Sequence, residues 1–216
     1  MYVVIAPDKF KGTLTATEAA AAIAEGWHTE RPQDELRQFP ISDGGDGFGE
    51  LLARHLGAEE QTIQTVNAAH EPIDAPWWWE PRSRLAIIES ARVVGLAMLP
   101  RERFHPFELD TFGLGAVLRA AAAARPRRCL LGIGGSATND AGFGVARALG
   151  WRFLDRRGQS IETWTRLADL GRIERPPRRP RLNTLLVAVD VENRLLGVRG
   201  ATRVYGPQKG IRLEDI

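Results

Sequence analysis

Residues 2–18, YVVIAPDKFKGTLTATE, decide the fold class because they combine a strand, a polar loop and the start of a helix. The apolar run from Tyr2 to Ala6 ends at Pro7 and is typical of a buried strand. Thr15-Ala16-Thr17-Glu18 is a capping box, and it predicts an Ala-rich helix that extends to about His28.

The same order returns in the next part of the chain. Leu36 to Ile41 is predicted to be a strand, and a helix is predicted from about Phe48 to His55, ending at Gly57. Between them lies the polar loop SDGGDG (42–47). Two strand–loop–helix units in succession predict an α/β fold with a parallel, doubly wound sheet. Ligands of such folds bind at the carboxyl ends of the strands, where both polar loops lie.

After about Gln61 the chain changes to short β-like pieces separated by Pro-containing turns. Within these pieces, Trp77-Trp78-Trp79 is interpreted as a half-buried strand rather than a stacking platform. The Pro- and Arg-rich stretch 171–181 is interpreted as a solvated linker without a regular element. The other expected elements are strands at 61–66, 77–80, 85–89, 129–133 and 185–189, and helices at about 112–124 and up to Leu149.

Composition indicates an ordinary globular protein, with 44% hydrophobic and 26% charged residues among 216. Cys129 is the only cysteine, which excludes an internal disulfide and a Cys-based zinc site. The N-terminus has no signal-peptide pattern and no stretch is apolar enough for a membrane span, so we expect a cytoplasmic protein without a membrane partner. A net charge of +2 is too small to indicate nucleic-acid binding.

Lysine is rare in this chain, which has 26 Arg but only Lys9, Lys11 and Lys209. All three lie in loop-like segments rich in Gly and Pro. A compact, mobile ammonium differs from the planar guanidinium, so these positions are candidates for point-charge contacts with anions. Chance placement on solvated loops is the alternative.

The loop from Asp8 to Thr13 leaves a strand and enters a capped helix, where free N–H groups and the helix dipole favour an anion. Lys11, beside Gly12, could place its ammonium on a phosphate or a carboxylate. A plain strand-to-helix turn remains equally open, because the spacing is not that of a phosphate-binding P-loop.

The loop 42–47 offers Asp43 and Asp46, three residues apart. Carboxylates so placed suit Mg²⁺, which prefers oxygen ligands. Asp43 could instead accept a proton from a substrate hydroxyl. A tight turn in which the Asp side chains bond their own backbone is the competing interpretation.

A third polar loop, GIGGSATND (132–140), combines paired glycines, two hydroxyls, an amide and an acid before a helix. This composition favours ligand binding through backbone N–H groups and the Ser136 and Thr138 hydroxyls. An Asx- or Thr-capped helix start is the alternative, although neither glycine is needed for one.

Asp190 follows a strand that looks buried, and with Asn193 it forms an acid–amide pair suited to a metal or a hydroxyl. Lys209 lies on a Pro-stiffened, Gly-flanked loop. Taken together, the loops supply the positioning and charge neutralisation that phosphoryl transfer needs. No Ser/His/Asp order or HExxH spacing is present, which weighs against hydrolases and zinc enzymes.

At these residues the chain resembles the bacterial type-1 glycerate kinase family. The matching stretches are APDKFKGTLTATEAA (6–20), DGGDG (43–47), GIGGSATNDAGFG (132–144) and DVENRLLGVRGATRVYGPQKG (190–210). The resemblance implies a Rossmann-like lobe and a second, inserted α/β lobe. We therefore expect the N-terminal part of the first lobe at 1–65 and the second lobe at 66–216. Family members continue beyond the last motif, so the chain is expected to be an N-terminal portion.

The resemblance also implies ATP- and Mg²⁺-dependent phosphorylation of D-glycerate, usually to 2-phosphoglycerate. Lys11, Asp43 and Asp190 are the expected catalytic residues, and one or both carboxylates the Mg²⁺ ligands. The residues expected to bind substrate or phosphate are Asp8, Lys9, Gly44, Gly45, Gly134, Gly135, Ser136, Thr138, Asn139, Asp140, Asn193 and Lys209. A truncated glycerate- or nucleotide-binding fragment without turnover is the alternative, and a homodimer is left open.

Overall fold

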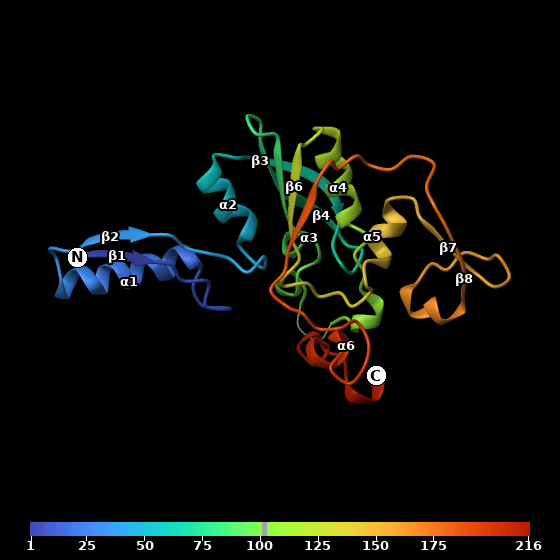
Figure 1. Ribbon diagram of the computed structural model, residues 1–216. Coiled ribbons are helices and arrows are strands. Elements are labelled where there is room, and N and C mark those ends of the chain that lie inside the picture. The colour runs from blue at the N-terminus through green and yellow to red at the C-terminus, as the bar shows by residue number, and fades with distance from the viewer. Residues whose placement is uncertain (101–102) are drawn as a thin grey trace.

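The computed structural model describes residues 1–100 and 103–216 as a mixed α/β protein (Figure 1). The strands are β1 Tyr2–Ile5, β2 Glu35–Gln38, β3 Glu59–Val66, β4 Pro72–Glu80, β5 Leu85–Glu89, β6 Arg128–Gly132, β7 Arg152–Asp155, β8 Leu170–Glu174 and β9 Leu185–Ala188. The α-helices are α1 Ala16–Glu30, α2 Phe48–Leu56, α3 Ala91–Val94, α4 Leu114–Ala123, α5 Phe143–Ala148 and α6 Ala201–Tyr205. Across the described residues, none of the helices combines the length and the apolar character needed to cross a bilayer.

The first unit consists of β1, α1 and β2, and it lies apart from the other strands at the left of Figure 1. β1 and β2 pair in parallel, and α1 packs on them through a small cluster that contains Ile5, Ala20 and Ala24. The predicted capping box is confirmed, because Thr15 accepts a bond from the Glu18 N–H and the Glu18 side chain bonds back. Strand β2 is shorter than predicted, because it ends at Gln38 and not at Ile41.

A five-stranded sheet forms the larger unit, in the order β3-β4-β5-β6-β9. β3, β4 and β5 pair antiparallel, whereas β5-β6 and β6-β9 pair in parallel. The predicted α/β class is therefore confirmed. Since β5, β6 and β9 run in the same direction, the loops that follow them leave from one edge of the sheet.

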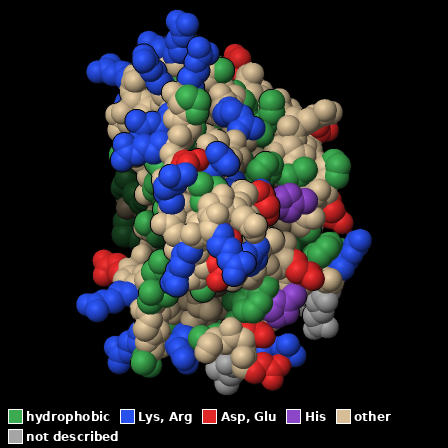
Figure 2. Space-filling view, turned by 90° about the vertical axis from the view of Figure 1, so that its right-hand side faces the viewer, with side chains coloured by type: hydrophobic (Ala, Val, Ile, Leu, Met, Phe, Trp, Pro, Cys, Tyr) green, Lys and Arg blue, Asp and Glu red, His purple; other side chains and the backbone are tan. Residues whose placement is uncertain are grey.

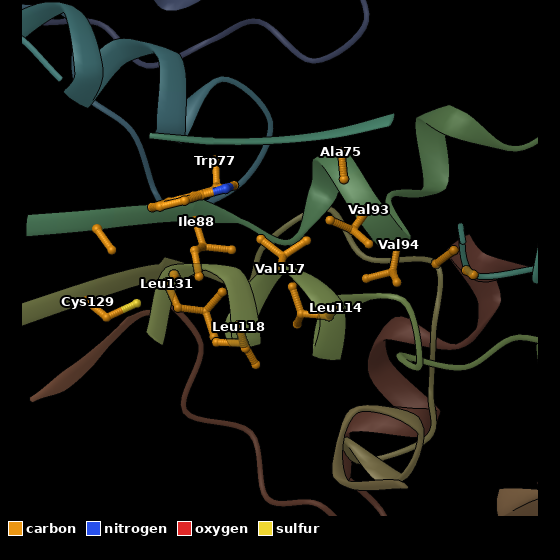
Figure 3. Close-up of a cluster of buried hydrophobic side chains, with 14 of the residues drawn as sticks. Ala75, Trp77, Ile88, Val93, Val94, Leu114, Val117, Leu118, Cys129 and Leu131 are labelled. Atoms are coloured by element: carbon orange, nitrogen blue, oxygen red, sulfur yellow. The ribbon is translucent and has the colours of Figure 1, made fainter. Parts of the chain in front are cut away.

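The two faces of this sheet are covered by different helices, which explains the tryptophan run. Trp77 packs in a core cluster with α4 residues, including Val117, whereas Trp78 packs in a second cluster with Phe48 of α2. Adjacent residues of a strand point to opposite faces, so a hydrophobic run is what a strand buried on both faces requires. Figure 3 shows the α4 face, with side chains of β4, β5 and β6 gathered over Val117 and Leu118.

The stretch after α5 departs from the linker expected from the sequence. β7 and β8 form an antiparallel hairpin, and β8 occupies Leu170–Glu174 at the start of the supposed linker. The expectation of no regular element was wrong there because the first proline, Pro176, lies beyond the strand. Figure 2 shows basic side chains spread over the face that carries this hairpin, interleaved with acidic and apolar ones.

Helix α2 and strand β3 belong with the larger unit by packing: α2 contacts β4 and β5, and β3 pairs with β4. The division at residue 65 stays a prediction, and this packing favours a boundary within 39–47, between β2 and α2. The expectation that the strand before Asp190 is buried was wrong. Three residues of this strand, β9, are 44–47% exposed: Leu185, Leu186 and Val187. β9 is an edge strand, so only one neighbour covers it.

Candidate functional site

The polar loops predicted from the sequence meet at the carboxyl edge of the strands. The Gly134 N–H donates to the Gly44 carbonyl at 3.0 Å, which joins the loop after β6 to the loop after β2. A Cβ on Gly134 would lie 2.7 Å from the Gly45 Cα, and one on Gly132 would lie 2.5 Å from the Gly44 oxygen. The two backbones are therefore in direct contact, and side chains at Gly132 or Gly134 would separate them.

The Lys9–Asp43 cluster, which contains Asp8, Lys9, Asp43 and Gly45, lies where the loops after β1 and β2 meet. Lys9 Nζ is 2.8 Å from Asp43 Oδ1 and 3.8 Å from Asp8 Oδ1. Burial opposes the charged form of Lys9, yet the hydrogen bond and charge of Asp43 outweigh it and raise the lysine pKa. Burial likewise opposes the charge of Asp43, but Lys9 and the Gly45 N–H lower the pKa of that carboxyl overall. Both groups are held in their charged forms.

Gly44 and Gly45 already use their N–H groups inside the 42–47 loop. The Gly45 N–H donates to Asp43 Oδ1 at 2.8 Å, and the Gly44 N–H donates to Ser42 Oγ at 3.3 Å. A Cβ on Gly44 would lie 2.7 Å from the Ala188 carbonyl oxygen, and Gly44 has φ of +92°. These features support a packing role for the two glycines, whereas their predicted role in phosphate binding stays a prediction.

The Lys209 cluster, made of Ser136, Thr138, Asn139, Asp140 and Lys209, joins the C-terminal segment to the Gly-rich loop. Lys209 Nζ donates to the Thr138 carbonyl at 2.5 Å and to Ser136 Oγ at 3.3 Å. Burial lowers the pKa of Lys209, and the charge of Asp140 partly offsets that effect. Asn139 Nδ2 donates to Thr202 Oγ1 at 3.1 Å. The structure thus brings five of the predicted residues together.

Asp140 is 2% exposed and organises the start of α5. Its Oδ2 accepts from the Gly144 N–H at 2.8 Å and from the Thr111 N–H and hydroxyl at 3.0 and 2.7 Å. These bonds match the helix-start alternative left open by the sequence. A positioning role for Asp140 is therefore better supported by the geometry than a contact with substrate.

Three predicted residues that carry polar side chains, Lys11, Asp190 and Asn193, lie outside both clusters. Lys11 is exposed, and it takes part in none of the ion pairs or side-chain hydrogen bonds found among residues 1–100 and 103–216. Asp190 is also exposed, beyond the edge strand β9. Asn193 Oδ1 accepts from the Tyr205 hydroxyl at 2.6 Å, and its amide donates to the Arg199 carbonyl at 3.2 Å. Asn193 therefore shapes its own loop in this structure.

Sequence reasoning missed Glu89 and Ser90, at the end of β5. Glu89 is 1% exposed, and it accepts hydrogen bonds from the Gly47 and Gly49 N–H groups at 3.0 and 2.8 Å. Ser90 is 3% exposed, and in the described part of the chain its Oγ is the buried side-chain atom that lacks a partner. Since buried polar atoms are nearly always paired, this hydroxyl marks a place for a water or a ligand group. The only signal in the sequence for these two residues was that polar side chains stand at the end of a predicted strand.

The carboxylates fit Mg²⁺ only as part of a larger ligand set. Within the two described ranges no three His, Cys, Asp or Glu side chains are grouped closely enough to hold a metal by themselves. Mg²⁺ bound with phosphates needs only one or two protein carboxylates, the rest of its ligands being waters and phosphate oxygens. Asp43, partly exposed beside Lys9, meets that requirement, and Asp190 is accessible.

Fold and site together define an α/β protein that presents charged, Gly-rich loops at the carboxyl edge of a mixed sheet. Comparison with known proteins makes the assignment specific: the profile of the Glycerate kinase family matches residues 3–216. This chain belongs to the glycerate kinase family.

Individual relatives agree with this assignment. The chain is 38% identical over 211 residues to the glycerate kinase of Halalkalibacterium halodurans and 37% identical over 213 residues to the glycerate 2-kinase of Escherichia coli K12. These matches cover 96% and 97% of this chain but 56% of each relative. A crystal structure assigned to glycerate kinase 2 of Salmonella typhimurium LT2 superposes with a TM-score of 0.82 at 34% identity, over 100% of this chain and 58% of that one. The chain thus spans little more than half the length of its relatives.

Proposed function

We propose that this chain belongs to an enzyme that transfers the γ-phosphate of ATP to D-glycerate and forms phosphoglycerate, with 2-phosphoglycerate as the expected product. The observation that carries the proposal is the meeting of the Lys9–Asp43 cluster and the Lys209 cluster at one Gly-rich loop after β6. Cations and carboxylates at the carboxyl edge of a sheet are suited to positioning phosphates and neutralising their charge.

Within this proposal the residues of the chain have distinct tasks. Lys9 and Lys11 bind anionic oxygens, with Lys11 free to reach substrate because no internal contact was found for it in the described ranges. Asp43, kept ionised by Lys9, accepts the hydroxyl proton of glycerate or holds the metal. Lys209 holds Ser136 and Thr138 in the loop that faces the phosphates.

A bound Mg²⁺ would neutralise phosphate charge, with Asp43 and Asp190 as its candidate ligands. The remaining residues proposed to contact substrate or phosphate are Asp8, Gly44, Gly45, Gly134, Gly135, Asn139 and Asn193. Asp140, predicted from the sequence to bind substrate or phosphate, is instead proposed to position the start of α5 through its bonds to Thr111 and Gly144. We also propose that the protein acts in the cytoplasm.

A ligand-binding protein without turnover is the second candidate, and one observation favours it: Asp190 is exposed and lies in neither cluster. Under this alternative the clusters bind ATP or glycerate, but the groups needed for transfer are not assembled around them.

Two measurements on the 216-residue chain separate these candidates. ADP release in the presence of Mg-ATP, with and without D-glycerate, reports turnover, and isothermal titration with each ligand reports binding. Glycerate-dependent ADP release supports the kinase, whereas binding without release supports the ligand-binding protein. Lack of both, or faster turnover of an unrelated acceptor, would refute the proposal.

A further inference from the structure

The carboxylate of Glu89 binds the start of α2 from a distant part of the sequence. Glu89 ends β5, in the middle of the sheet, and both of its oxygens accept backbone N–H groups: Oε1 from Gly47 and Oε2 from Gly49. The residue is 1% exposed, so these bonds lie away from water. Hydrogen bonds to an ionised acceptor are about twice as strong as neutral ones.

Helix α2 needs this contact because its own N-cap residue has no side chain that could accept a hydrogen bond from the first N–H groups of the helix. Gly47 occupies the N-cap position in the left-handed region, at φ of +87°, and makes no side-chain cap. The unpaired N–H groups and the dipole at a helix N-terminus favour an anion. Glu89 is that anion, and it comes from the sheet rather than from the local sequence.

The same contact fixes the loop that carries Asp43. Gly47 closes the 42–47 loop, and Gly49 lies so close to the sheet that a Cβ would be 1.9 Å from the Trp78 ring. With Gly44 bonded to Gly134, the loop is attached to the sheet at both of its ends. Because Glu89 already accepts the Gly47 and Gly49 N–H groups, these two donors at the start of α2 are not available to a phosphate.

We infer that Glu89 is a positioning residue, which holds the 42–47 loop so that Asp43 faces Lys9 and the ligand. Its effect on loop order follows from the contacts alone, whereas its effect on phosphoryl transfer rests on the proposed function. Glu89 acts through Gly47 and Gly49 and does not itself touch the substrate.

Glu80 provides a matched control at the opposite end of the sheet. It is also a buried glutamate, 8% exposed, at the end of β4. Its carboxylate accepts the Arg82 and Ser83 N–H groups of a loop, both at 2.7 Å. Glu80→Gln therefore removes the same kind of contact from the same sheet, but at the end opposite to Glu89, since Glu80 pairs with Leu85 at the start of β5.

Amide hydrogen exchange of the intact chain tests the loop contact. In Glu89→Gln, one carboxylate oxygen becomes an NH₂ donor facing a backbone donor, so exchange at Gly47 and Gly49 should rise about tenfold or more. Glu89→Asp keeps the charge on a shorter side chain and should give a smaller increase. Glu80→Gln should raise exchange at Arg82 and Ser83 and leave Gly47 and Gly49 unchanged.

The inference fails if Glu89→Gln and Glu89→Asp leave exchange at Gly47 and Gly49 within twofold of wild type. It also fails if Glu80→Gln raises exchange there equally, since the effect would then be a general loss of stability. These readouts need no ligand and no turnover.

A kinetic measurement tests the catalytic consequence separately. With D-glycerate and Mg-ATP, Glu89→Gln should lower kcat about tenfold with KM changed less than twofold, whereas Glu80→Gln should leave both close to wild type. Equal kcat in Glu89→Gln and wild type overturns the link to transfer. If the wild-type chain shows no turnover, the proposed function fails in this chain, and hydrogen exchange alone decides the role of Glu89.

Discussion

Replacing Gly49 by alanine should destabilise the larger unit, even though alanine is the better helix former. The new Cβ would lie 1.9 Å from Cζ3 of Trp78, where carbon atoms normally approach to about 3.5–4.0 Å. Trp78 is 4% exposed and has no room to move away, so α2 must shift by roughly 1.5–2 Å. That shift also breaks the 2.8 Å bond from the Gly49 N–H to Glu89.

The net loss should be about 1.5–5 kcal/mol of unfolding free energy. Overpacking costs about 1–3 kcal/mol and loss of a hydrogen bond to a charged group about 1.5–3 kcal/mol, against a helix-propensity gain of about 1 kcal/mol. Gly26→Ala in α1 is the matched control, because a Cβ there meets nothing within 4 Å. It should stabilise α1 by up to about 1 kcal/mol.

Urea unfolding followed by far-UV circular dichroism and tryptophan fluorescence measures the two variants, and hydrogen exchange assigns each effect to its helix. If Gly49→Ala is as stable as wild type, α2 does not pack on Trp78 as described. If Gly26→Ala destabilises by as much as Gly49→Ala, the cost is a general effect of the substitution rather than of the close contact.

The other predictions concern chemistry and pH. Lys11→Ala should lower kcat/KM about 100-fold in steady-state assays, and Lys11→Arg should remain poor because a planar fork does not replace a point charge; full activity of the arginine variant would contradict this role. Asp43→Asn and Asp190→Asn should each lose most activity, and a raised Mg²⁺ concentration should partly rescue only the variant that lost a metal ligand. Near-normal rates in both variants would mean that these loops are structural turns without a catalytic role. Burial raises the pKa of Cys129 to about 12, so a thiol reagent at pH 8 should label it only as fast as the chain unfolds. Burial raises the pKa of Glu89 from 4.5, and the negative charge of Asp46 adds to the increase. The hydrogen bonds from Gly49 and Gly47 and the positive charge of Arg92 lower the pKa, but they do not cancel the effect of burial. The stability that Glu89 contributes is therefore fully present below pH 4.5 and is lost as the pH rises through its raised pKa. The measurable quantity is the unfolding free energy of wild type minus that of Glu89→Gln, which should fall over that pH range. A difference that does not change with pH would refute the argument that burial raises this pKa.

Local sequence signals predicted the elements whose causes are themselves local. The capping box at Thr15 marks the start of α1, and the left-handed Gly57 marks the end of α2; both features are present in the structure. The meeting of the loops after β1 and β2 also followed from the sequence, since parallel neighbours end at the same edge. Lys9 and Asp43, 34 residues apart, form their ion pair there.

The remaining features depend on contacts between distant residues that no local pattern reveals. Glu89 resembles any polar residue at the end of a buried strand, and its partners lie 40 and 42 residues earlier. Strand β8 was missed because the nearby prolines dominated the composition of 171–181, and its pairing with β7 joins separate segments. The exposure of Asp190 depends on whether β9 has a second neighbour, which its own residues do not specify.

The backbone contact between the 42–47 and 132–136 loops also limits how the protein can move. Gly44 and Gly134 share a hydrogen bond, and the space between them admits no Cβ. One loop therefore cannot slide past the other without losing that bond. We expect opening and closing around a ligand to occur instead in the segments that lead to the β1–α1–β2 unit, which the Lys9–Asp43 ion pair connects to the 42–47 loop.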